Sequence, residues 1–392
     1  MRKVFVSIVC FILAIMCVTI SEKEGIVLAN YAYNMFENFT SKSYVLLEAN
    51  SGKVLVSKNE NEKMQVASIC KLMTSLITLE KLESGALKLE DELVASEHAC
   101  SMEGSQAFLD AGSSYTVANL LKSVVVASAN DSAVVLAESI SGSESAFVEL
   151  MNKRAKELGM HSTVYANATG LPAPNQYSTA MDTSLILKEI SKYDLYVEYS
   201  NIWMDKFVHP SGRETELVNT NRLIKYYDKC KTGKTGFTDE AGYCLASSAS
   251  NGNLDLIAVA LKCDKAQDRF KESMDLFNYG FANFENVKIV DKTEKLDDVP
   301  VFGGKKSTAN IEYNNDFYVV TNKGDKTEYV VNIEVFDKVK APAQKGTKVG
   351  VATILSSGRI VGEVDIVLSE NVEKHDFVDI VTKIAKNWEL VG

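Results

Sequence analysis

Histidine is scarce in this chain of 392 residues, and so are the motifs that commonly hold metal ions. The 4 histidines lie far apart, and neither an HExxH nor a CxxC pattern occurs. The common zinc and dithiol motifs are therefore absent. If the chain is an enzyme, we expect its acid–base groups to be lysine, serine or carboxylates, with no metal and no other cofactor.

Positively charged residues are also few: the chain has 42 lysine and arginine residues but 52 aspartate and glutamate residues. A nucleic-acid-binding protein usually carries a basic face, so nucleic acid is not an expected partner. Glycine and proline contribute only 22 and 5 residues, whereas 46% of the chain is hydrophobic. This composition excludes a mainly disordered or fibrous protein and predicts about two or three globular domains.

The longest apolar run extends from Val4 to Ile20, directly after Arg2 and Lys3. This pattern is typical of a secretory signal peptide, and we predict such a leader over residues 1–29. An uncleaved membrane anchor is the alternative, because the run approaches the roughly 20 residues that span a bilayer. In both cases we expect the rest of the chain to be exported, to the outer face of the cytoplasmic membrane or the cell wall.

The cysteines do not indicate a disulfide framework. Of the 7 in the chain, those outside the leader are odd in number and irregularly spaced. A mature chain of this size also buries enough apolar surface to fold without disulfide bonds. We expect reduced thiols that are mostly buried.

Helical and strand-like patterns alternate over the first predicted domain, residues 30–285. A hairpin is predicted around Ala49–Lys53, because short apolar runs flank these turn residues. Apolar residues at helical spacing predict one helix that begins at or near Ser68 and another that Gly159 caps. Apolar runs around residues 242–262 predict strands. The predicted fold class is therefore α+β.

Beyond residue 286 the pattern changes to short β-rich segments, separated by turn residues at intervals of roughly ten. We predict a small all-β sandwich over residues 286–371. Residues 372–392 place apolar side chains on one face of a predicted helix. Such an amphipathic helix fits a membrane interface or a site on its own domain, and the pattern leaves both open.

Two short motifs place hydroxyl groups beside candidate proton acceptors or amides. Ser68 and Lys71 form the chain's SxxK pattern, and on a helix these positions share a face. A desolvated lysine can take the proton of serine, which is otherwise a weak nucleophile. Ser128 and Asn130 stand where a helical pattern breaks, and such a break exposes side chains.

The third motif is KTG, present as two overlapping copies between Lys231 and Thr238. We take Lys234 as the functional lysine because Phe237, Thr238 and a strand-rich stretch follow it. A phosphate-binding P-loop is excluded because Asp228 occupies a position that requires glycine. Each motif alone also fits an ordinary loop or helix start, but together and in this order they indicate one serine acyl-enzyme site.

This set of motifs resembles that of the low-molecular-mass penicillin-binding proteins, the serine D-alanyl-D-alanine carboxypeptidases of peptidase family S11. The resemblance covers residues 40–370 and includes Tyr44–Leu55, Asn167–Leu171 and Lys234–Leu245. It implies a β-lactamase/transpeptidase-like catalytic domain, in which helices flank an antiparallel sheet, followed by a small β-rich domain.

The resemblance also implies a role for each motif residue. Ser68 would be the acylated nucleophile and Lys71 its base. Ser128 and Lys234 would relay a proton to the leaving D-alanine, while Asn130 would orient the substrate amide. The implied substrates are peptidoglycan stem pentapeptides, and β-lactam antibiotics would acylate the same serine.

Substrate contacts are implied along the KTG segment. The backbone N–H groups of Ser68 and Phe237 would form an oxyanion hole. Thr235 and Thr238 would hold the terminal carboxylate of the substrate, together with Arg269. The full predicted substrate-binding set is Thr235, Gly236, Phe237, Thr238 and Arg269.

Three positions depart from the family pattern without removing a catalytic group. Cys70 replaces the threonine or valine that is common inside the SxxK box. Thr220 stands where some members carry a second arginine, and Thr169 where many have histidine. We expect these changes to affect substrate affinity and the binding of the substrate's terminal carboxylate.

Other functions compete with the carboxypeptidase. A peptidoglycan endopeptidase would use the same residues, and a non-catalytic penicillin-binding wall protein could share the fold. Such a protein would tolerate the loss of Lys71, Ser128 or Lys234, yet all are present. A class A β-lactamase is disfavoured, because no glutamate suited to deacylation appears near Asn167–Leu171 and the β-rich domain would be superfluous.

Overall fold

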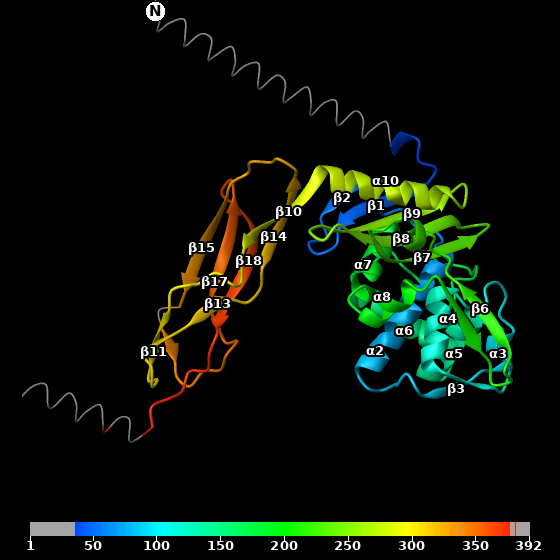
Figure 1. Cartoon of the computed structure of the whole chain (residues 1–392), viewed down its shortest axis with the longest axis horizontal. Helices are drawn as coiled ribbons and strands as arrows, with labels where there is room; N and C mark the ends of the chain where they lie inside the picture. Colours follow the sequence, from blue (N-terminus) through cyan, green and yellow to red (C-terminus); the bar gives the residue numbers. More distant parts are fainter. Residues whose placement is uncertain (1–35, 337, 377–380, 382–392) are drawn as a thin grey trace, which may run out of the picture. The chain divides into compact units, whose positions relative to one another are not determined.

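The computed structural model describes residues 36–336, 338–376 and 381. The chain divides into two compact units between Ala282 and Asn283, just before the predicted boundary at residue 286. The first unit mixes helices and strands and the second is β-rich (Figure 1). The predicted leader lies outside the described residues, and so do residues 377–380 and 382–392 of the predicted amphipathic helix. The start of that helix was predicted wrongly, because residues 372–376 are not helical: Val372 and Lys374 form β-bridges with Ala343 and Gly304. Among those that are described, no helix is both long enough and apolar enough to cross a membrane.

The N-terminal unit is organised around a five-stranded antiparallel sheet with the strand order β2-β1-β9-β8-β7. The predicted hairpin and the predicted strands around residues 242–262 all belong to it. Its edge strand β7 carries the KTG motif. The strands are β1 (Ser43–Glu48), β2 (Val54–Lys58), β7 (Cys230–Thr238), β8 (Gly242–Ser250) and β9 (Asp255–Cys263).

Helices cover both faces of this sheet (Figure 1). On one face lies α10 (Asp268–Asn283), where Gly280 allows a close approach: a Cβ there would come within 2.5 Å of the Leu256 side chain. The opposite face carries the larger helical layer. That layer contains the 3-10 turn η1 (Ala67–Cys70), α2 (Lys71–Glu83), α3 (Glu97–Cys100), α4 (Val117–Val126), α5 (Asn130–Ser141), α6 (Glu144–Glu157), α7 (Ala180–Ile190) and α8 (Asp194–Ser200). The short α9 (Leu223–Tyr226) contacts the edge strand β7.

The helix after the predicted nucleophile is central to this layer. Every residue of α2 from Lys71 to Leu79 is buried, as expected for a helix packed on all sides. Serine and threonine side chains cap its neighbours: Thr116 accepts from the backbone at the start of α4, and Ser143 does so at the start of α6. The unit also contains the small antiparallel pairs β3 (Glu92–Val94) with β4 (Ser114–Thr116), and β5 (Met204–Val208) with β6 (Glu214–Val218).

The C-terminal unit has a separate apolar core, in which Ala352, Ile354, Ile366 and Leu368 are fully buried. A four-stranded sheet with the order β13-β18-β17-β15 is accompanied by the pair β10-β14 and by the short group β12-β11-β16. The elements are β10 (Phe284–Val290), β11 (Val299–Phe302), β12 (Thr308–Ala309), β13 (Ile311–Tyr313), β14 (Phe317–Asn322), β15 (Tyr329–Val335), β16 (Val339–Lys340), β17 (Lys348–Ser356) and β18 (Arg359–Leu368).

Candidate active site

Ser68 lies in the 3-10 turn η1, immediately before α2. Its neighbours Ala67, Ile69 and Cys70 are buried, whereas Ser68 itself is partly exposed. Ala67 adopts a φ of 49°, in the left-handed region that non-glycine residues rarely occupy. Apolar packing on both sides of Ser68 therefore holds a strained turn that leaves its hydroxyl accessible.

Lys71 follows at the first position of α2, and its side chain is completely buried. Its Nζ lies 3.0 Å from Ser68 Oγ and donates a hydrogen bond of 2.6 Å to the Thr169 carbonyl. Burial lowers the pKa of Lys71 from 10.5 to about 7, although the nearby Cys70 and Asp131 act in the opposite direction. A lysine amine that loses its proton near neutral pH, within hydrogen-bond reach of a serine hydroxyl, has the properties of a general base.

The second hydroxyl–lysine pair comes from distant parts of the chain. Ser128 lies between α4 and α5 with a φ of 64°, and its Oγ accepts a hydrogen bond of 2.8 Å from Lys234 Nζ on β7. Lys234 is buried and also donates to the Thr235 carbonyl. Burial lowers the pKa of Lys234 well below its usual range, and the positive charges of Lys71 and Arg269 add to this effect. The effect of the Lys71 charge on Lys234 indicates that the second pair lies near the first.

Asn130 begins α5 and leaves one polar atom without a partner. Its backbone N–H donates to the Ser105 carbonyl at 2.7 Å, and its side-chain N–H donates to the Glu103 carbonyl. Its Oδ1 is buried and has no hydrogen-bond partner among the described residues. Because a buried acceptor without a partner is costly, this oxygen is suited to receive an N–H group of a ligand.

Strand β7 approaches the nucleophile turn at Gly236. A Cβ at this position would lie 2.3 Å from the Val66 carbonyl oxygen and 3.3 Å from Ala67 Cβ, so only glycine fits. This contact brings the backbone of Phe237 next to the turn that carries Ser68. The Phe237 ring stacks on Tyr243 at 4.3 Å and is 47% exposed, which leaves its outer face open to a ligand.

The predicted carboxylate-binding residues are engaged with protein groups in this structure. Thr235 Oγ1 donates a hydrogen bond of 2.6 Å to Thr220 Oγ1, and Thr238 Oγ1 accepts from the backbone of Ala241. Arg269 donates to the carbonyls of Gly236, at 3.0 Å, and of Cys244, at 3.4 Å. These contacts brace β7 and β8, so the role of Arg269 toward a substrate carboxylate stays a prediction.

Sequence reasoning did not identify three groups that shape this site. The Thr169 carbonyl contacts Lys71, and the Asp131 carboxylate accepts from the backbone of Ala107 and Leu109. The third group is the Thr220 hydroxyl, which contacts Thr235. From the sequence, Thr169 and Thr220 were noted only as departures from the family pattern. The position of Asp131 next to Asn130 could have pointed to a structural carboxylate, but nothing in the sequence places a backbone carbonyl beside Lys71.

An antiparallel sheet flanked by helices, with an SxxK turn, a second serine and a KTG edge strand meeting beside it, defines the β-lactamase/transpeptidase-like class of serine hydrolases. Comparison with known proteins narrows this class. Residues 30–265 match the D-alanyl-D-alanine carboxypeptidase family, peptidase S11, and residues 284–374 match the C-terminal domain of penicillin-binding protein 5. The chain belongs to the peptidase S11 family of D-alanyl-D-alanine carboxypeptidases.

Individual relatives support this assignment. The chain is 36% identical to D-alanyl-D-alanine carboxypeptidase DacF of Bacillus subtilis, over 89% of this chain and 90% of the relative. A crystal structure of penicillin-binding protein 5 from Haemophilus influenzae superimposes with a TM-score of 0.71 at 30% identity, covering 86% of this chain and 98% of that one. A D-alanyl-D-alanine endopeptidase of Pseudomonas aeruginosa is 34% identical over 53% of this chain and 67% of the relative.

Proposed function

We propose that this protein is a serine carboxypeptidase that removes the terminal D-alanine from peptidoglycan stem pentapeptides. The observation that carries the proposal is the pairing of two buried lysines with two serine hydroxyls, Lys71 with Ser68 at 3.0 Å and Lys234 with Ser128 at 2.8 Å. The family to which the chain belongs supports the choice of substrate.

In the proposed reaction, Ser68 Oγ attacks the carbonyl carbon of the penultimate D-alanine while Lys71 takes the hydroxyl proton. The backbone N–H groups of Ser68 and Phe237 would stabilise the oxyanion, and such donors are worth roughly 10²–10³ in rate each. When the C–N bond breaks, the proton that Lys71 took from Ser68 would pass through Lys234 and Ser128 to the leaving amine of D-alanine, which leaves Lys71 neutral again. Water then attacks the ester carbonyl while Lys71 takes its proton, and Lys71 returns that proton to Ser68 Oγ as the ester C–O bond breaks.

Substrate orientation would depend on groups around the two serines. Asn130 Oδ1, buried without a partner in the described structure, would accept an N–H of the substrate backbone. Because β7 is at the edge of the sheet, an extended peptide could lie along it. Thr235 and Thr238 would then turn their hydroxyls to the terminal carboxylate, and Arg269 would supply positive charge nearby.

D-alanine release from a stem pentapeptide tests this proposal directly. We expect wild-type protein to release D-alanine and the Ser68→Ala variant to release none, while both melt at the same temperature. Labelled penicillin should modify Ser68 in the wild type, as peptide mass mapping would show. D-alanine release by a folded Ser68→Ala variant would refute the acyl-enzyme mechanism.

A second candidate function is cleavage of peptide cross-links. The observation that favours it is the relative described as an endopeptidase, which is 34% identical over 53% of this chain. Cross-linked peptide dimers and pentapeptide monomers, compared at equal concentration, separate the two activities. We expect faster turnover of the monomer, and a preference for the dimer would make the endopeptidase the main activity.

The proposed substrate lies outside the cytoplasm, so we also propose that the protein acts at the outer face of the cytoplasmic membrane or in the cell wall. The apolar run after Arg2 and Lys3 supports export. Contact between the C-terminal segment and the membrane remains part of this proposal. Fractionation of cells that express wild-type protein, or protein ending at residue 376 so that the core residue Val372 is kept, tests it: loss of membrane association on truncation is expected.

A further inference from the structure

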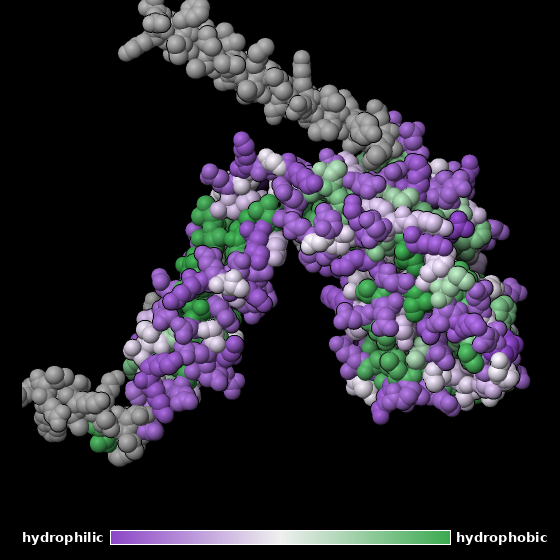
Figure 2. Space-filling model, viewed as in Figure 1, coloured by the Kyte–Doolittle hydropathy of each residue, from purple (hydrophilic) through white to green (hydrophobic). Residues whose placement is uncertain are grey.

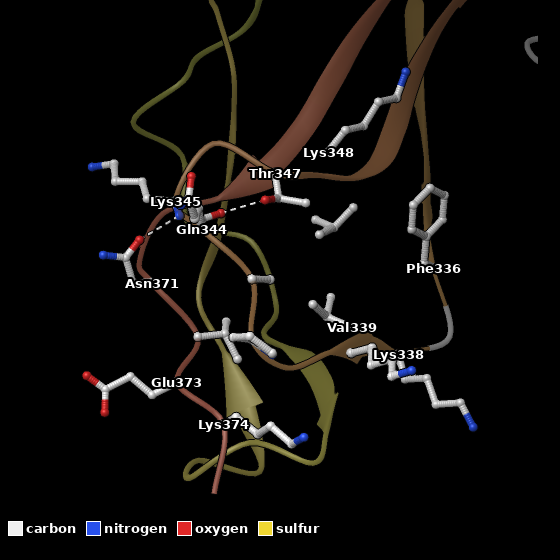
Figure 3. Close-up of a pocket in the computed structure, with 15 residues that line it drawn as sticks. Phe336, Lys338, Val339, Gln344, Lys345, Thr347, Lys348, Asn371, Glu373 and Lys374 are labelled. Atoms are coloured by element: carbon white, nitrogen blue, oxygen red, sulfur yellow. Dashed lines mark hydrogen bonds between the residues drawn. The ribbon is translucent and has the colours of Figure 1, made fainter. Parts of the chain in front are cut away.

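A groove at one end of the C-terminal unit is separate from the catalytic residues. It encloses about 1240 Å³ between the segment around β16, the start of β17 and residues 371–374 (Figure 3). Its lining includes the side chains of Val339, Val349 and Val372, which are buried and belong to the apolar core of the unit. The floor of the groove is therefore part of a packed core.

Lysine side chains dominate the polar part of this groove, although the chain as a whole has a net charge of −10. Lys348 is paired with Asp365 at 2.5 Å, and the acidic Glu373 is paired with Lys305 at 3.3 Å. Among the described residues, no carboxylate lies within ion-pair distance of the other lining lysines. Those lysines are Lys338, Lys340, Lys345 and Lys374.

Aromatic and amide groups accompany the lysines. Phe336 lines the groove and is 56% exposed, while Lys338 Nζ lies 5.4 Å from the centre of the exposed Phe302 ring. Across the groove in Figure 3, the Lys345 backbone donates a hydrogen bond of 2.8 Å to Asn371 Oδ1. The site thus offers positive charge at its rim and apolar surface inside it.

We propose that this groove binds a linear polymer that carries phosphodiester groups along a short polyol or sugar backbone. Phosphate is favoured because its several acceptor oxygens can bridge neighbouring lysine ammonium groups. The apolar lining and the exposed Phe336 ring would contact the carbon backbone between successive phosphates. This inference concerns a different unit from the catalytic residues and does not rest on the proposed function.

A flat membrane surface is a poorer match than a thin polymer. The lysines border a depression, which a polymer strand can enter and a bilayer cannot. The carboxylates at the groove are already neutralised: Glu373, which lines it, pairs with Lys305, and Asp365 pairs with the lining Lys348. The remaining lining lysines therefore give the groove a net positive charge that a thin anionic strand can approach closely.

Fluorescence anisotropy with a labelled glycerol phosphate oligomer tests the proposal on the full chain. The groove variant combines Lys338→Gln, Lys345→Gln and Lys374→Gln. The matched control combines Lys292→Gln, Lys295→Gln and Lys326→Gln, which removes the same charge from exposed sites of the same unit. We expect the groove variant to lose roughly tenfold or more in affinity and to show a weaker salt dependence, while the control stays within about twofold of wild type.

Three results would overturn the proposal. The first is an absence of binding by wild-type protein at physiological salt. The second is an equal loss in both triple variants, which would assign binding to overall charge. The third is displacement of the oligomer by polyglutamate, or by vesicles containing phosphatidylglycerol, as effectively as by unlabelled oligomer. Unchanged melting temperature and D-alanine release in both variants would show that the comparison concerns folded protein.

Discussion

Lys71 is enclosed on all sides, and this enclosure gives an ordinary lysine the proton affinity of a base. Its pKa near 7 means that the free amine, rare at neutral pH in an exposed lysine, is well populated here. The Thr169 carbonyl holds Nζ in place without adding a competing positive charge. Histidine is therefore not needed for proton transfer at neutral pH.

The acylation rate is expected to follow the ionisation of Lys71. The rate should rise by about tenfold per pH unit below the pKa and level off above about pH 7. Stopped-flow measurement with labelled penicillin from about pH 5 to 9 checks this profile. Lys71→Arg should abolish acylation, because arginine keeps its proton. A rate that is constant across neutrality would contradict the assignment of Lys71 as the base.

The same ionisation affects stability in a defined direction. The folded-state pKa of Lys71 lies near 7 and below its usual value of 10.5, so between these pH values the unfolded chain binds more protons. The contribution of Lys71 to the free energy of unfolding therefore rises with pH across this window. Denaturation of wild type and Lys71→Met at several pH values measures this contribution. The unfolding free energy of wild type should rise more steeply between pH 7 and 10.5 than that of the variant.

Gly170 is required for the contact between the Thr169 carbonyl and the nucleophile turn. Its φ is 80°, and a Cβ there would lie 2.0 Å from the Ala67 carbonyl oxygen. We expect Gly170→Ala to cost about 3 kcal/mol or more of unfolding free energy and to reduce acylation in the protein that still folds. Thermal denaturation and penicillin labelling measure the two effects.

Gly159 provides the matched control. It has a φ of 79°, but a Cβ there would have no atom within 4 Å. Gly159→Ala should therefore cost only the backbone strain, about 1 to 2 kcal/mol, and leave acylation unchanged. Equal effects of the two substitutions would show that conformation, and not the contact with Ala67, decides the requirement at Gly170.

At the scale of elements, the break between α4 and α5 organises one side of the site. Ser128 occupies the break, and Asn130 and Asp131 open the next helix. The buried Asp131 carboxylate accepts hydrogen bonds from Ala107 and Leu109, so it anchors the loop whose carbonyls hold Asn130. One carboxylate thus connects two segments that border the candidate active site.

Asp131→Asn is expected to loosen this loop. An amide offers one acceptor oxygen where the carboxylate offers two, so a buried N–H of Ala107 or Leu109 loses its partner, at a cost of about 1–3 kcal/mol. Removing the charge should also lower the pKa of Lys71 and move the acylation profile to lower pH. Calorimetry and the pH profile measure both effects.

Asp110→Asn is the control, because Asp110 pairs with Arg213 at a half-exposed site of the same loop. We expect a loss of at most about 1 kcal/mol and no shift in the profile. If Asp110→Asn moved the profile as far as Asp131→Asn, a general change in loop charge would explain both.

At the scale of the whole molecule, the two units have separate apolar cores. The proposed catalytic residues Ser68, Lys71, Ser128 and Lys234 all belong to the first unit, which ends at Ala282. Figure 2 shows hydrophilic residues gathered at the end of the second unit from which the chain continues toward its C-terminus. The proposed polymer groove lies at that end and is lined by residues of the second unit alone.

Removal of the second unit should leave the acyl-transfer chemistry intact. A protein that ends at Ala282 is expected to react with labelled penicillin within about threefold of the full-length rate, because each unit has its own core. Labelling kinetics and thermal denaturation check this expectation. A truncated chain that folds but reacts far more slowly would assign the C-terminal unit a part in catalysis.

The fold class was predictable because local patterns agree with the tertiary packing. Turn residues 49–53 join β1 to β2 as predicted, and α6 ends shortly before Gly159, whose φ of 79° suits a helix C-terminus. The start of the nucleophile helix was predicted less accurately. Ser68 lies in a 3-10 turn, because contacts of Ala67 with Gly170 and Gly236 shape the backbone there.

The sequence by itself determined the chemical inventory: the SxxK, SxN and KTG motifs, and the scarcity of histidine that leaves lysine as the base. Their order along the chain was enough to indicate the family. Only the tertiary structure decided how these groups act on one another. Burial sets the pKa of Lys71, and Lys234 reaches Ser128 across 106 positions of sequence. Desolvation and close approach depend on three-dimensional packing, which no local pattern encodes.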